Sequence, residues 1–374
     1  MNVVFISNYF THHQQPFCDA ISKNPNVKFN FIETIKMEQE RIEQMWGLKH
    51  IPNYVVQAYK EDVSQYTQTI VEDADVIIIG SASTNWLNKL SSKKRVIIIC
   101  TERIYKKKRA WYKFPAHAIK LRKKYKRINN NGYLFCSGAY VAKDFTQYGL
   151  FKNRCYKWGY FPQTIAYDID NLIKNKKKNS IIWVARFIDW KHPEIAVEIA
   201  KKLKNDGYNF ELSMIGNGEK FEEINQMVST LGLEENVHLL GTMKPEEVRK
   251  YMEKSEIHLF TSDRQEGWGA VLNEAMNSAC VSVANENIGS VPFLIEDGVN
   301  GFNYDGTVEH LYKKIKVLFD DKNKIEKLSR NAYYTILNEW NAERAAEKSV
   351  ALFESFLKAE KPTELFKSGV GSAI

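Results

Sequence analysis

The chain has 374 residues, enough for two domains of ordinary size. Its composition, 44% apolar and 26% charged, is that of a folded soluble protein and excludes a disordered chain, and no apolar run approaches the ~20 residues that span a bilayer. The five cysteines are scattered and form no C-x-x-C pair, which predicts reduced thiols in a cytoplasmic protein and no zinc site.

The first half of the chain alternates short apolar runs with helical stretches. It opens on MNVVFISNYF, which lacks a basic leader and a cleavage site, so we expect a first strand and not a signal peptide. The expected strands are 3–8, 28–33, 54–59, 75–80, 95–100 and 133–138. Their nearly continuous valine and isoleucine runs predict strands buried on both faces of a parallel sheet. Residues 1–166 form the first predicted domain.

The basic segment, residues 103–127, carries 12 lysines and arginines and no acid. Subtracting these 12 charges from the net charge of +8 leaves −4, so the rest of the chain is mildly acidic. Aromatic residues lie among the cations, a combination that suits an anionic membrane surface and also nucleic acid. No nucleic-acid motif accompanies the segment, and a solvated pair of basic helices is the plain alternative. We expect it to hold the protein peripherally at the inner face of the cell membrane.

A polar, lysine-rich stretch at 167–179 predicts a linker. The alternation restarts over 180–340, which predicts a second doubly wound α/β domain. Its expected strands are 180–187, 210–216, 237–241, 257–262 and 281–286, and its expected helices are 193–206, 219–231, 245–254, 268–279 and 291–296. A last helix, 341–360, is expected to pack back on the first domain, and 361–374 is expected to be a tail.

The stretch VARFIDWKHPE (184–194) carries two cations at a strand end, which is where ligands bind in doubly wound sheets. Arg186 ends a buried strand, and Lys191 follows just before Pro193 opens a helix. Two fixed cations beside a helix N terminus favour an anion, and they suit a diphosphate better than a single carboxylate. Surface salt bridging is the alternative for either residue alone.

Two further strand ends carry turns before helices. In IGNGEKF (215–221), Gly216 and Gly218 permit a tight turn or a close approach of the backbone to a ligand. Phe221 stands where the dinucleotide fingerprint requires a third glycine, so a plain turn and a ligand contact both stay open. LLGTMKPEE (239–247) is the second such turn.

The stretch EGWGAVLNEAM (266–276) carries two carboxylates eight residues apart. Glu266 precedes the expected helix, and Glu274 lies at the edge of its apolar face. Gly267 and Gly269 leave backbone N–H groups open to a ligand at the helix start. Carboxylates only accept hydrogen bonds, so the pair suits a hydroxyl-rich ligand such as ribose or a hexose. A capping Glu266 and a solvated Glu274 are the alternative.

These stretches resemble glycosyltransferase family 4, in particular its bacterial surface-polysaccharide branch. Glu266 and Glu274 match the family's E-x7-E motif, VARFIDWK matches its Arg…Lys motif, and IGNGE, LLGTM and NIGSVPFLIEDGVNGFNY (287–304) occupy the matching order. The resemblance is specific over 180–305 and weaker before it. It implies the GT-B fold, in which two Rossmann-like doubly wound domains face each other across a cleft. It also implies a retaining hexosyltransferase that moves sugar from a nucleotide-sugar, here a UDP-sugar, to a glycan or lipid-linked acceptor.

The resemblance also implies roles for individual residues. Arg186 and Lys191 would hold the leaving diphosphate, Glu266 would meet the donor sugar, and these three form the catalytic set. Glu274 would accept hydrogen bonds from the ribose. The other donor-binding residues implied are Gly267, Trp268, Gly269, Gly216, Thr242, Met243, Gly289 and Ser290. On the acceptor side, the implied residues are His12, His13, Glu102 and Arg103.

Three positions depart from the family pattern. His192 stands where the family usually has glycine, and Phe293 stands where it often has glutamate. SNYF (7–10) replaces the glycine-rich loop of the first domain. These departures concern the orientation of the sugar and the acceptor and leave the donor motifs intact.

No cofactor or metal is expected. DAD (73–75) offers a D-x-D pattern, but Asp75 opens a buried strand, so we interpret it as structural. The resemblance implies front-face attack, with a donor phosphate oxygen taking the acceptor proton. Two alternatives stay open: a sugar-nucleotide epimerase on the same fold, and a non-catalytic glycosyltransferase-like subunit that docks on membranes. Retention of all four charged motif residues argues against the second alternative.

Overall fold

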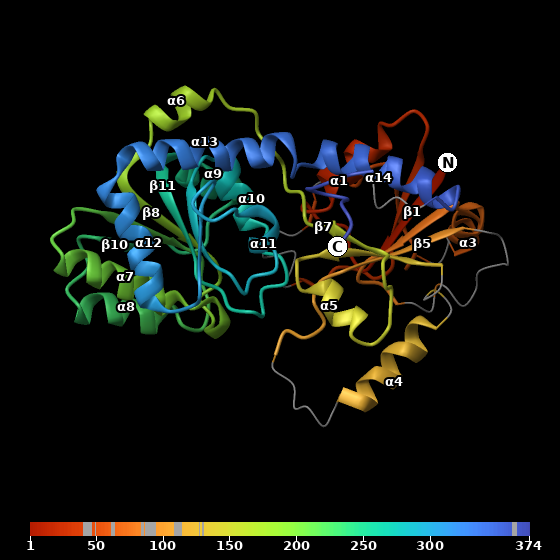
Figure 1. The fold of residues 1–374 in the computed structure, drawn as a ribbon, viewed down its shortest axis with the longest axis horizontal. Helices are drawn as coiled ribbons and strands as arrows, with labels where there is room; N and C mark the ends of the chain where they lie inside the picture. The colour runs from red at the N-terminus through yellow and green to blue at the C-terminus, as the bar shows by residue number, and fades with distance from the viewer. Residues whose placement is uncertain are drawn as a thin grey trace. The chain divides into compact units, whose positions relative to one another are not determined.

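The computed structural model describes residues 1–39, 47–48, 50–60, 64–83, 86, 95–107, 114–126, 128, 131–360 and 365–374. They form two compact units. Unit 1 comprises Met1–Gln163 together with Trp340–Ile374, and unit 2 comprises Thr164–Glu339. Each unit is a parallel sheet with helices on both faces (Figure 1). Within the described ranges, no helix combines the length and the hydropathy that crossing a membrane requires.

The sheet of unit 1 has seven strands in the described residues, in the order β3-β2-β1-β4-β5-β6-β7, all parallel. The strands are β1 (Asn2–Ser7), β2 (Lys28–Glu33), β3 (Val55–Gln57), β4 (Val76–Ile79), β5 (Val96–Thr101), β6 (Tyr133–Ser137) and β7 (Cys155–Trp158). The order reverses between β1 and β4, so the loops after these two strands diverge to opposite faces and leave a crevice.

The helices of unit 1 cover both faces of its sheet. They are α1 (Gln15–Ser22), α3 (Ser64–Asp73), α4 (Phe114–Tyr125), α5 (Val141–Thr146) and α14 (Ala342–Leu357). Helices α3, α4 and α5 share one apolar core with alternate residues of β1 and β4. On the other face α14 packs against α1 and stacks the ring of Phe356 on Tyr133, with centroids 3.5 Å apart.

The sheet of unit 2 has six strands in the order β10-β9-β8-β11-β12-β13, again all parallel. The strands are β8 (Lys177–Val184), β9 (Glu211–Ile215), β10 (Val237–Leu239), β11 (Ser255–Phe260), β12 (Val281–Asn285) and β13 (Phe302–Tyr304). Their near-continuous burial explains why they read as apolar runs. The order reverses between β8 and β11.

Two layers of helices enclose this second sheet. Helices α7 (Pro193–Asn205), α8 (Phe221–Thr230) and α12 (Val308–Asp320) share one core. Helices α9 (Pro245–Lys254) and α10 (Val271–Asn277) cover the opposite face, and α13 (Lys322–Asn338) packs on α10. The short elements are α6 (Ile169–Lys174), α11 (Val291–Leu294) and a 3-10 turn at Asp189–Lys191.

Residues 167–179 are not a linker in the structure. Asp168 caps α6 by accepting the Asn171 N–H, and β8 already begins at Lys177. Between them Lys176 is buried, and its ammonium donates to the carbonyls of Met252, Ser255 and Ser278. The lysine-rich composition suggested solvent, but one of these lysines instead joins the segment to the core of unit 2.

The C-terminal residues are also more ordered than a tail. Residues 361–364 lie outside the described part of the chain, but 365–374 belong to unit 1. Val370 is fully buried, and Ser372 accepts the Lys157 N–H at 2.9 Å. Ile374 donates its N–H to Cys155 at 2.9 Å. The last residues therefore extend the sheet at β7, because that edge strand has backbone groups to satisfy.

Candidate active site

Two loops of unit 2 meet where its strand order reverses. One follows β8 and the other follows β11, and β8 and β11 are neighbours in the sheet. The Asp263 N–H donates to the Trp190 carbonyl at 2.9 Å, and the Thr261 hydroxyl donates to the Lys191 carbonyl at 2.6 Å. The buried indole of Trp183 holds that hydroxyl at 2.8 Å. The loops are therefore fixed to each other at the position where doubly wound sheets bind ligands.

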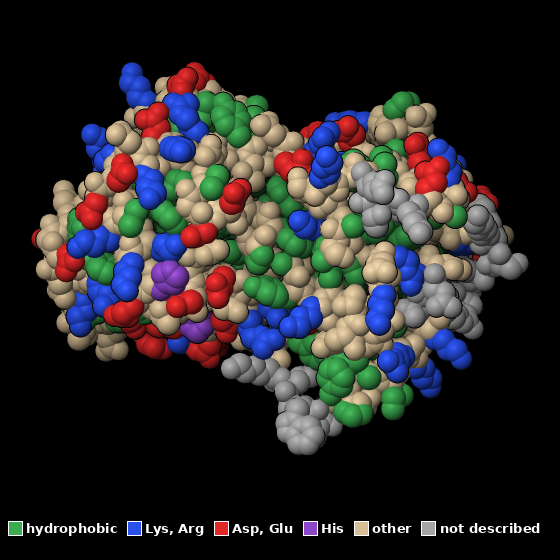
Figure 2. Space-filling view, viewed as in Figure 1, with side chains coloured by type: hydrophobic (Ala, Val, Ile, Leu, Met, Phe, Trp, Pro, Cys, Tyr) green, Lys and Arg blue, Asp and Glu red, His purple; other side chains and the backbone are tan. Residues whose placement is uncertain are grey.

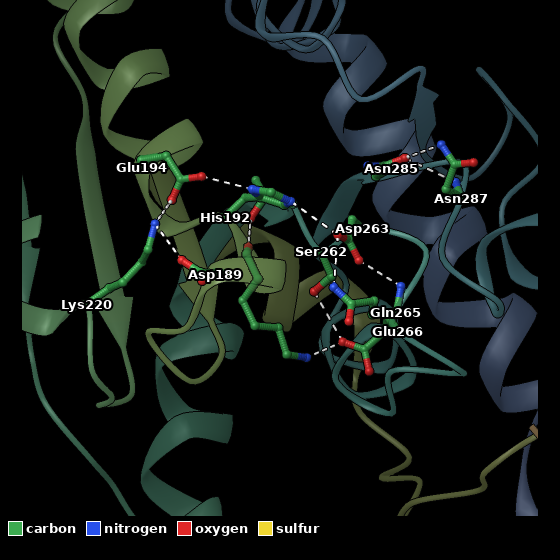
Figure 3. Close-up of polar contacts among 12 residues, drawn as sticks. Asp189, His192, Glu194, Lys220, Ser262, Asp263, Gln265, Glu266, Asn285 and Asn287 are labelled. Carbon is green, nitrogen blue, oxygen red and sulfur yellow. Dashed lines mark hydrogen bonds and ion pairs between the residues drawn. The ribbon is translucent and has the colours of Figure 1, made fainter. Parts of the chain in front are cut away.

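Lys191 and Glu266, 75 positions apart in the chain, form an ion pair across these loops. Each side chain is only 12% exposed. The Ser262 hydroxyl donates to the same carboxylate oxygen at 3.1 Å (Figure 3), and the Lys191 ammonium lies 4.3 Å from the centre of the Trp190 ring. The structure thus brings together two of the three residues predicted to be catalytic, with opposite charges that neutralise each other.

Arg186, the third predicted catalytic residue, lies on the same loop as Lys191. It is exposed and makes no ion pair with another described residue. Its neighbours are fixed, because the Ala185 N–H donates to Ile215 at 3.1 Å and Phe187 is fully buried. The loop therefore anchors the backbone of Arg186 while its guanidinium remains available to an anion.

His192 links the two loops through side chains. It adopts a left-handed conformation, with φ +51°, which explains why glycine suits this position in the resembling family. Its Nδ1 lies 2.9 Å from Glu194 and its Nε2 lies 3.6 Å from Asp263 (Figure 3). The hydrogen bond with Glu194 raises the pKa of His192, and burial opposes this rise. A protonated ring satisfies both carboxylates at once.

The N terminus of α7 lies beside carboxylates as well as beside the two cations. Glu194 occupies its first turn, and Lys220 lies 3.1 Å from Asp189 and 3.7 Å from Glu194 (Figure 3). The Glu194 carboxylate already occupies the positive end of the helix. The cations beside this turn are Arg186, which is exposed, and Lys191, which is paired with Glu266.

Glu274 lies on α10 and is placed by an arginine of α9. The Arg249 guanidinium donates to the Glu274 carbonyl at 3.1 Å and lies 3.7 Å from its carboxylate. It also donates to Asn277 at 3.1 Å. The Glu274 side chain remains 27% exposed, and burial of its carboxyl raises the pKa, which Arg249 partly counteracts. Sequence reasoning missed Arg249, although its place on the helix after the Thr242–Met243 turn was a usable signal.

The predicted donor-binding residues around Glu266 serve mainly to hold its loop. Trp268 is fully buried, and its indole donates to Asn273 at 2.9 Å. The buried hydroxyl of Ser290 donates to the Trp268 carbonyl at 2.6 Å, and the Gly289 N–H donates to the Glu266 carbonyl at 3.3 Å. These side chains face the interior, so a ligand here would meet backbone groups and Glu266.

Gly269 and Gly267 lie before α10, which begins at Val271 and not at 268 as expected. Gly269 has φ +83°, and a Cβ there would lie 2.3 Å from the Phe260 ring. Gly267 is buried in the same turn. Gly269 thus allows the chain to pass closely over the Phe260 ring at the end of β11.

Backbone packing in unit 2 requires a glycine at position 216. With φ +138°, a Cβ at this position would lie 1.9 Å from the Ala185 carbonyl oxygen. Its N–H donates to the Gly241 carbonyl at 2.9 Å, which brings the following turn alongside. In that turn Thr242 is exposed and Met243 is half-buried. The glycine is therefore explained by backbone packing, whether or not a ligand binds the turn beside it.

Unit 1 contains a cavity of about 290 Å³ at the carboxyl ends of its strands. His13, Glu102 and Arg103 line it, three of the four residues predicted on the acceptor side. His12 is not among the lining residues, but its ring centre lies 3.9 Å from that of His13. Aromatic rings and hydroxyls supply much of the remaining lining, from Phe5, Ser7, Phe17, Thr101, Ser137, Trp158, Tyr160 and Phe161.

The charged groups of this cavity are each held by a neighbour. Glu102 accepts from the Tyr160 hydroxyl at 2.8 Å and from Lys106 at 2.7 Å. The Arg103 guanidinium lies 4.6 Å from the centre of the Tyr140 ring. Burial, with a smaller contribution from His12, lowers the pKa of His13 to about 3, so its imidazole is neutral at pH 7.

Comparison with solved structures identifies the architecture. The structure of HepE of Anabaena in complex with UDP aligns with a TM-score of 0.69 at 18% identity, over 95% of this chain and 100% of that one. A glycosyltransferase of Rickettsia africae aligns with a TM-score of 0.67 at 15% identity, over 96% and 98%. The fold is GT-B. This confirms the predicted pair of doubly wound parallel-sheet domains.

Sequence comparison concerns unit 2. Residues 166–335 match the family described as Glycosyl transferases group 1. The amylovoran biosynthesis glycosyltransferase AmsK of Erwinia amylovora is 32% identical over 127 residues, which is 33% of this chain and 31% of that protein. The capsular polysaccharide biosynthesis glycosyltransferase CapH of Staphylococcus aureus is 32% identical over 128 residues, 32% and 34%. The chain thus spans about a third of the length of each of these relatives.

Proposed function

We propose that this protein is a retaining glycosyltransferase of family 4 that transfers a hexose from a UDP-sugar to a glycan or lipid-linked acceptor in surface polysaccharide synthesis. The observation that carries the proposal is the meeting of Lys191 and Glu266 at the strand-order reversal of unit 2, with Arg186 exposed on the same loop. Support comes from relatives that are named as polysaccharide glycosyltransferases and from a GT-B neighbour solved with UDP.

In this proposal the donor diphosphate binds Arg186 and Lys191. A diphosphate carries more charge than one carboxylate, so it competes for the Lys191 ammonium that Glu266 holds in the unliganded protein. Once the diphosphate holds Lys191, the Glu266 oxygen that paired with it is free to accept hydrogen bonds from the donor sugar hydroxyls. Glu274 accepts hydrogen bonds from the ribose hydroxyls. The Gly216 and Thr242–Met243 turn borders the nucleoside, and Gly289 lines the phosphate side.

The proposed reaction breaks the bond between the sugar carbon and the diphosphate oxygen and forms a bond from that carbon to an acceptor oxygen. The acceptor attacks from the face that the diphosphate leaves, so the configuration is retained. Its proton passes to a donor phosphate oxygen. Negative charge develops on the diphosphate, where the two cations stabilise it. Burial of Lys191 strengthens that stabilisation because little water screens it.

The cavity of unit 1 is the proposed acceptor site. It offers a carboxylate at Glu102 and a neutral imidazole at His13, both suited to accept hydrogen bonds from sugar hydroxyls. Its aromatic lining suits the apolar faces of a sugar ring. Arg103 supplies a positive charge for an acceptor that carries phosphate or carboxylate.

The test is calorimetric titration of the full chain with UDP, GDP and ADP, followed by transfer assays with UDP-sugars. We expect UDP to bind, and we expect Arg186→Ala to weaken that binding while Lys178→Ala, an exposed lysine on β8, leaves it unchanged. We expect transfer to persist in EDTA, since the proposed site uses lysine and arginine in place of a metal. Binding of none of the three nucleotides would refute the proposal, and isomerisation of a UDP-sugar without acceptor would replace it with an epimerase.

A further inference from the structure

Helix α4 presents a basic face that the proposed reaction does not use. Its buried residues, Leu121 and Tyr125, pack into the core of unit 1. The opposite side carries Lys120 and Lys123, and Lys126 follows directly after the last helical residue; all three are exposed. No acidic residue occurs from 114 to 126, and these three lysines form no ion pair with a described residue. Residues 108–113 and 127 of the basic segment lie outside the described part of the chain.

The same helix also exposes apolar side chains. Ile119 is 69% exposed and Phe114 is 46% exposed. At 100° per residue Ile119 lies between Lys123 and Lys126 on the outward side, about opposite Leu121. Figure 2 shows hydrophobic and Lys or Arg side chains gathered over α4. Cations around a central isoleucine differ from the usual surface helix, whose outward side is polar throughout.

This helix is firmly attached to unit 1. The Arg122 guanidinium donates to the Tyr148 carbonyl at 2.9 Å. The Phe114 ring lies 4.6 Å from that of Tyr148, and the Tyr125 ring lies 5.6 Å from that of Phe145. The backbone of the outward face is therefore fixed before binding. Little conformational entropy is lost in ordering it when a partner binds.

We infer that the outward face of α4 docks the protein peripherally on an anionic lipid bilayer, with Lys120, Lys123 and Lys126 among the headgroups and Ile119 at the boundary with the acyl chains. A bilayer interacts favourably with both kinds of side chain, because basic residues attract anionic headgroups and apolar residues enter the interface. A nucleic-acid phosphate backbone interacts favourably only with the lysines. This inference does not depend on the proposed sugar transfer, because liposome binding is measured without donor or acceptor.

The size of the effect follows from the charges. Each lysine near an anionic surface contributes roughly fivefold in partitioning, so removing three weakens binding about 10²-fold. Burying Ile119 in the interface contributes about tenfold. The attraction of the lysines falls with salt, since the Debye length shrinks from ~30 Å at 0.01 M to ~3 Å at 1 M. The contribution of Ile119 persists at high salt.

The test is co-sedimentation of the full chain with phosphatidylcholine vesicles, with and without phosphatidylglycerol, at low and high salt. The triple variant Lys120→Gln, Lys123→Gln, Lys126→Gln keeps good helix formers and is expected to lose about 10²-fold of its binding to anionic vesicles. The matched triple variant Lys174→Gln, Lys178→Gln, Lys250→Gln removes three exposed lysines of unit 2. It carries the same change in net charge and is expected to bind as wild type.

A second pair of variants tests the apolar part. Ile119→Ser is expected to weaken binding about tenfold, whereas Val317→Ser, at a 39% exposed position on α12, leaves it unchanged. Circular dichroism verifies that all variants are folded. Equal sedimentation with neutral and anionic vesicles, or equal losses in the two triple variants, overturns the inference. Binding to an oligonucleotide that depends on the three α4 lysines, with vesicle binding that does not, replaces the lipid by nucleic acid.

Discussion

The two units place different chemistry at the same point of similar sheets. In unit 2 the loops at the strand-order reversal carry paired charges, and Lys191, Glu266, His192 and Asp263 connect them. In unit 1 the cavity at the carboxyl ends is lined largely by rings and hydroxyls, and Glu102 is held by Tyr160 and Lys106. The first arrangement is cross-linked by ion pairs, while the second encloses a cavity of about 290 Å³.

This difference between a charged site and a hydroxyl-lined cavity is consistent with a family sequence pattern that is confined to unit 2. The family match covers 166–335 and stays within unit 2. In the proposed function, a diphosphate requires cations at fixed positions, which would account for the readable spacing of Arg186 and Lys191. A ligand rich in hydroxyls is satisfied by many combinations of hydroxyl, carboxylate and imidazole. The acceptor site proposed in unit 1 would therefore need no short sequence motif.

The largest expected effect tests the charged arrangement of unit 2. Lys191→Ala should lower the turnover for sugar transfer by ~10²-fold or more, because one group that stabilises the leaving diphosphate is lost. Lys178→Ala is the matched control. Since the variant leaves Glu266 largely buried without its ammonium, thermal unfolding is measured as well. Turnover close to wild type at saturating donor would contradict the role given to Lys191.

The second effect concerns the rigidity of unit 2. Gly216→Ala forces a Cβ to within 1.9 Å of the Ala185 oxygen at φ +138°, whereas Gly232→Ala, at φ +61°, meets nothing within 4 Å. We expect the first to destabilise the protein by about 2 kcal/mol more than the second, close to 30-fold in the folding equilibrium. Denaturant titration of both variants measures the difference. Equal losses would mean that the loop after β9 adapts freely.

The third prediction addresses unit 1. Glu102→Gln keeps the shape of the cavity but removes a charged acceptor, so the KM for the acceptor should rise about tenfold, with the donor dissociation constant unchanged. Glu72→Gln, which affects a partly exposed ion pair with Arg95 outside the cavity, is the control. A change in the donor dissociation constant instead would contradict the assignment of Glu102 to the acceptor site.

The smallest effect is a pH dependence in unit 2. The pKa of His192 is raised above 6.5 in the folded protein, so its bridge between Glu194 and Asp263 is complete below pH 6.5 and is lost as the pH rises through the raised value. The bridge holds the loop of Lys191, so UDP affinity should fall a few-fold over that rise. His192→Asn tolerates the left-handed backbone and should abolish the wild-type decrease. If the UDP affinities of wild type and His192→Asn changed with pH in the same way, the bridge would not position Lys191.

The fold was largely predictable because parallel strands buried on both faces are rich in valine and isoleucine. The strands at 76–79 and 96–101 are such runs. Two short strands were missed, β7 and β13, because CYKW and FNY are aromatic or polar and each has only three or four residues. The α6 helix was mistaken for a linker because few of its residues are buried.

The site was predictable as a set of positions but not as a set of contacts. The spacing of Lys191 and Glu266 from their strands indicates that both reach the same edge of the sheet. It does not indicate that they pair with each other, because that depends on side-chain direction. The same limit hid Arg249 and the network of His192, Asp263 and Lys220, whose members come from separate elements.

Unit 1 is built from both ends of the chain, and this affects how the protein is made. Helix α14 supplies Phe356 to the ring of Tyr133, and Ser372 satisfies β7. A ribosome synthesises these residues after unit 2, so unit 2 is complete while the unit begun first still lacks a helix and its edge partner. A premature stop codon after unit 2 would therefore damage the opposite half of the protein, and a fragment ending at residue 163 would leave the aromatic face of β6 in water.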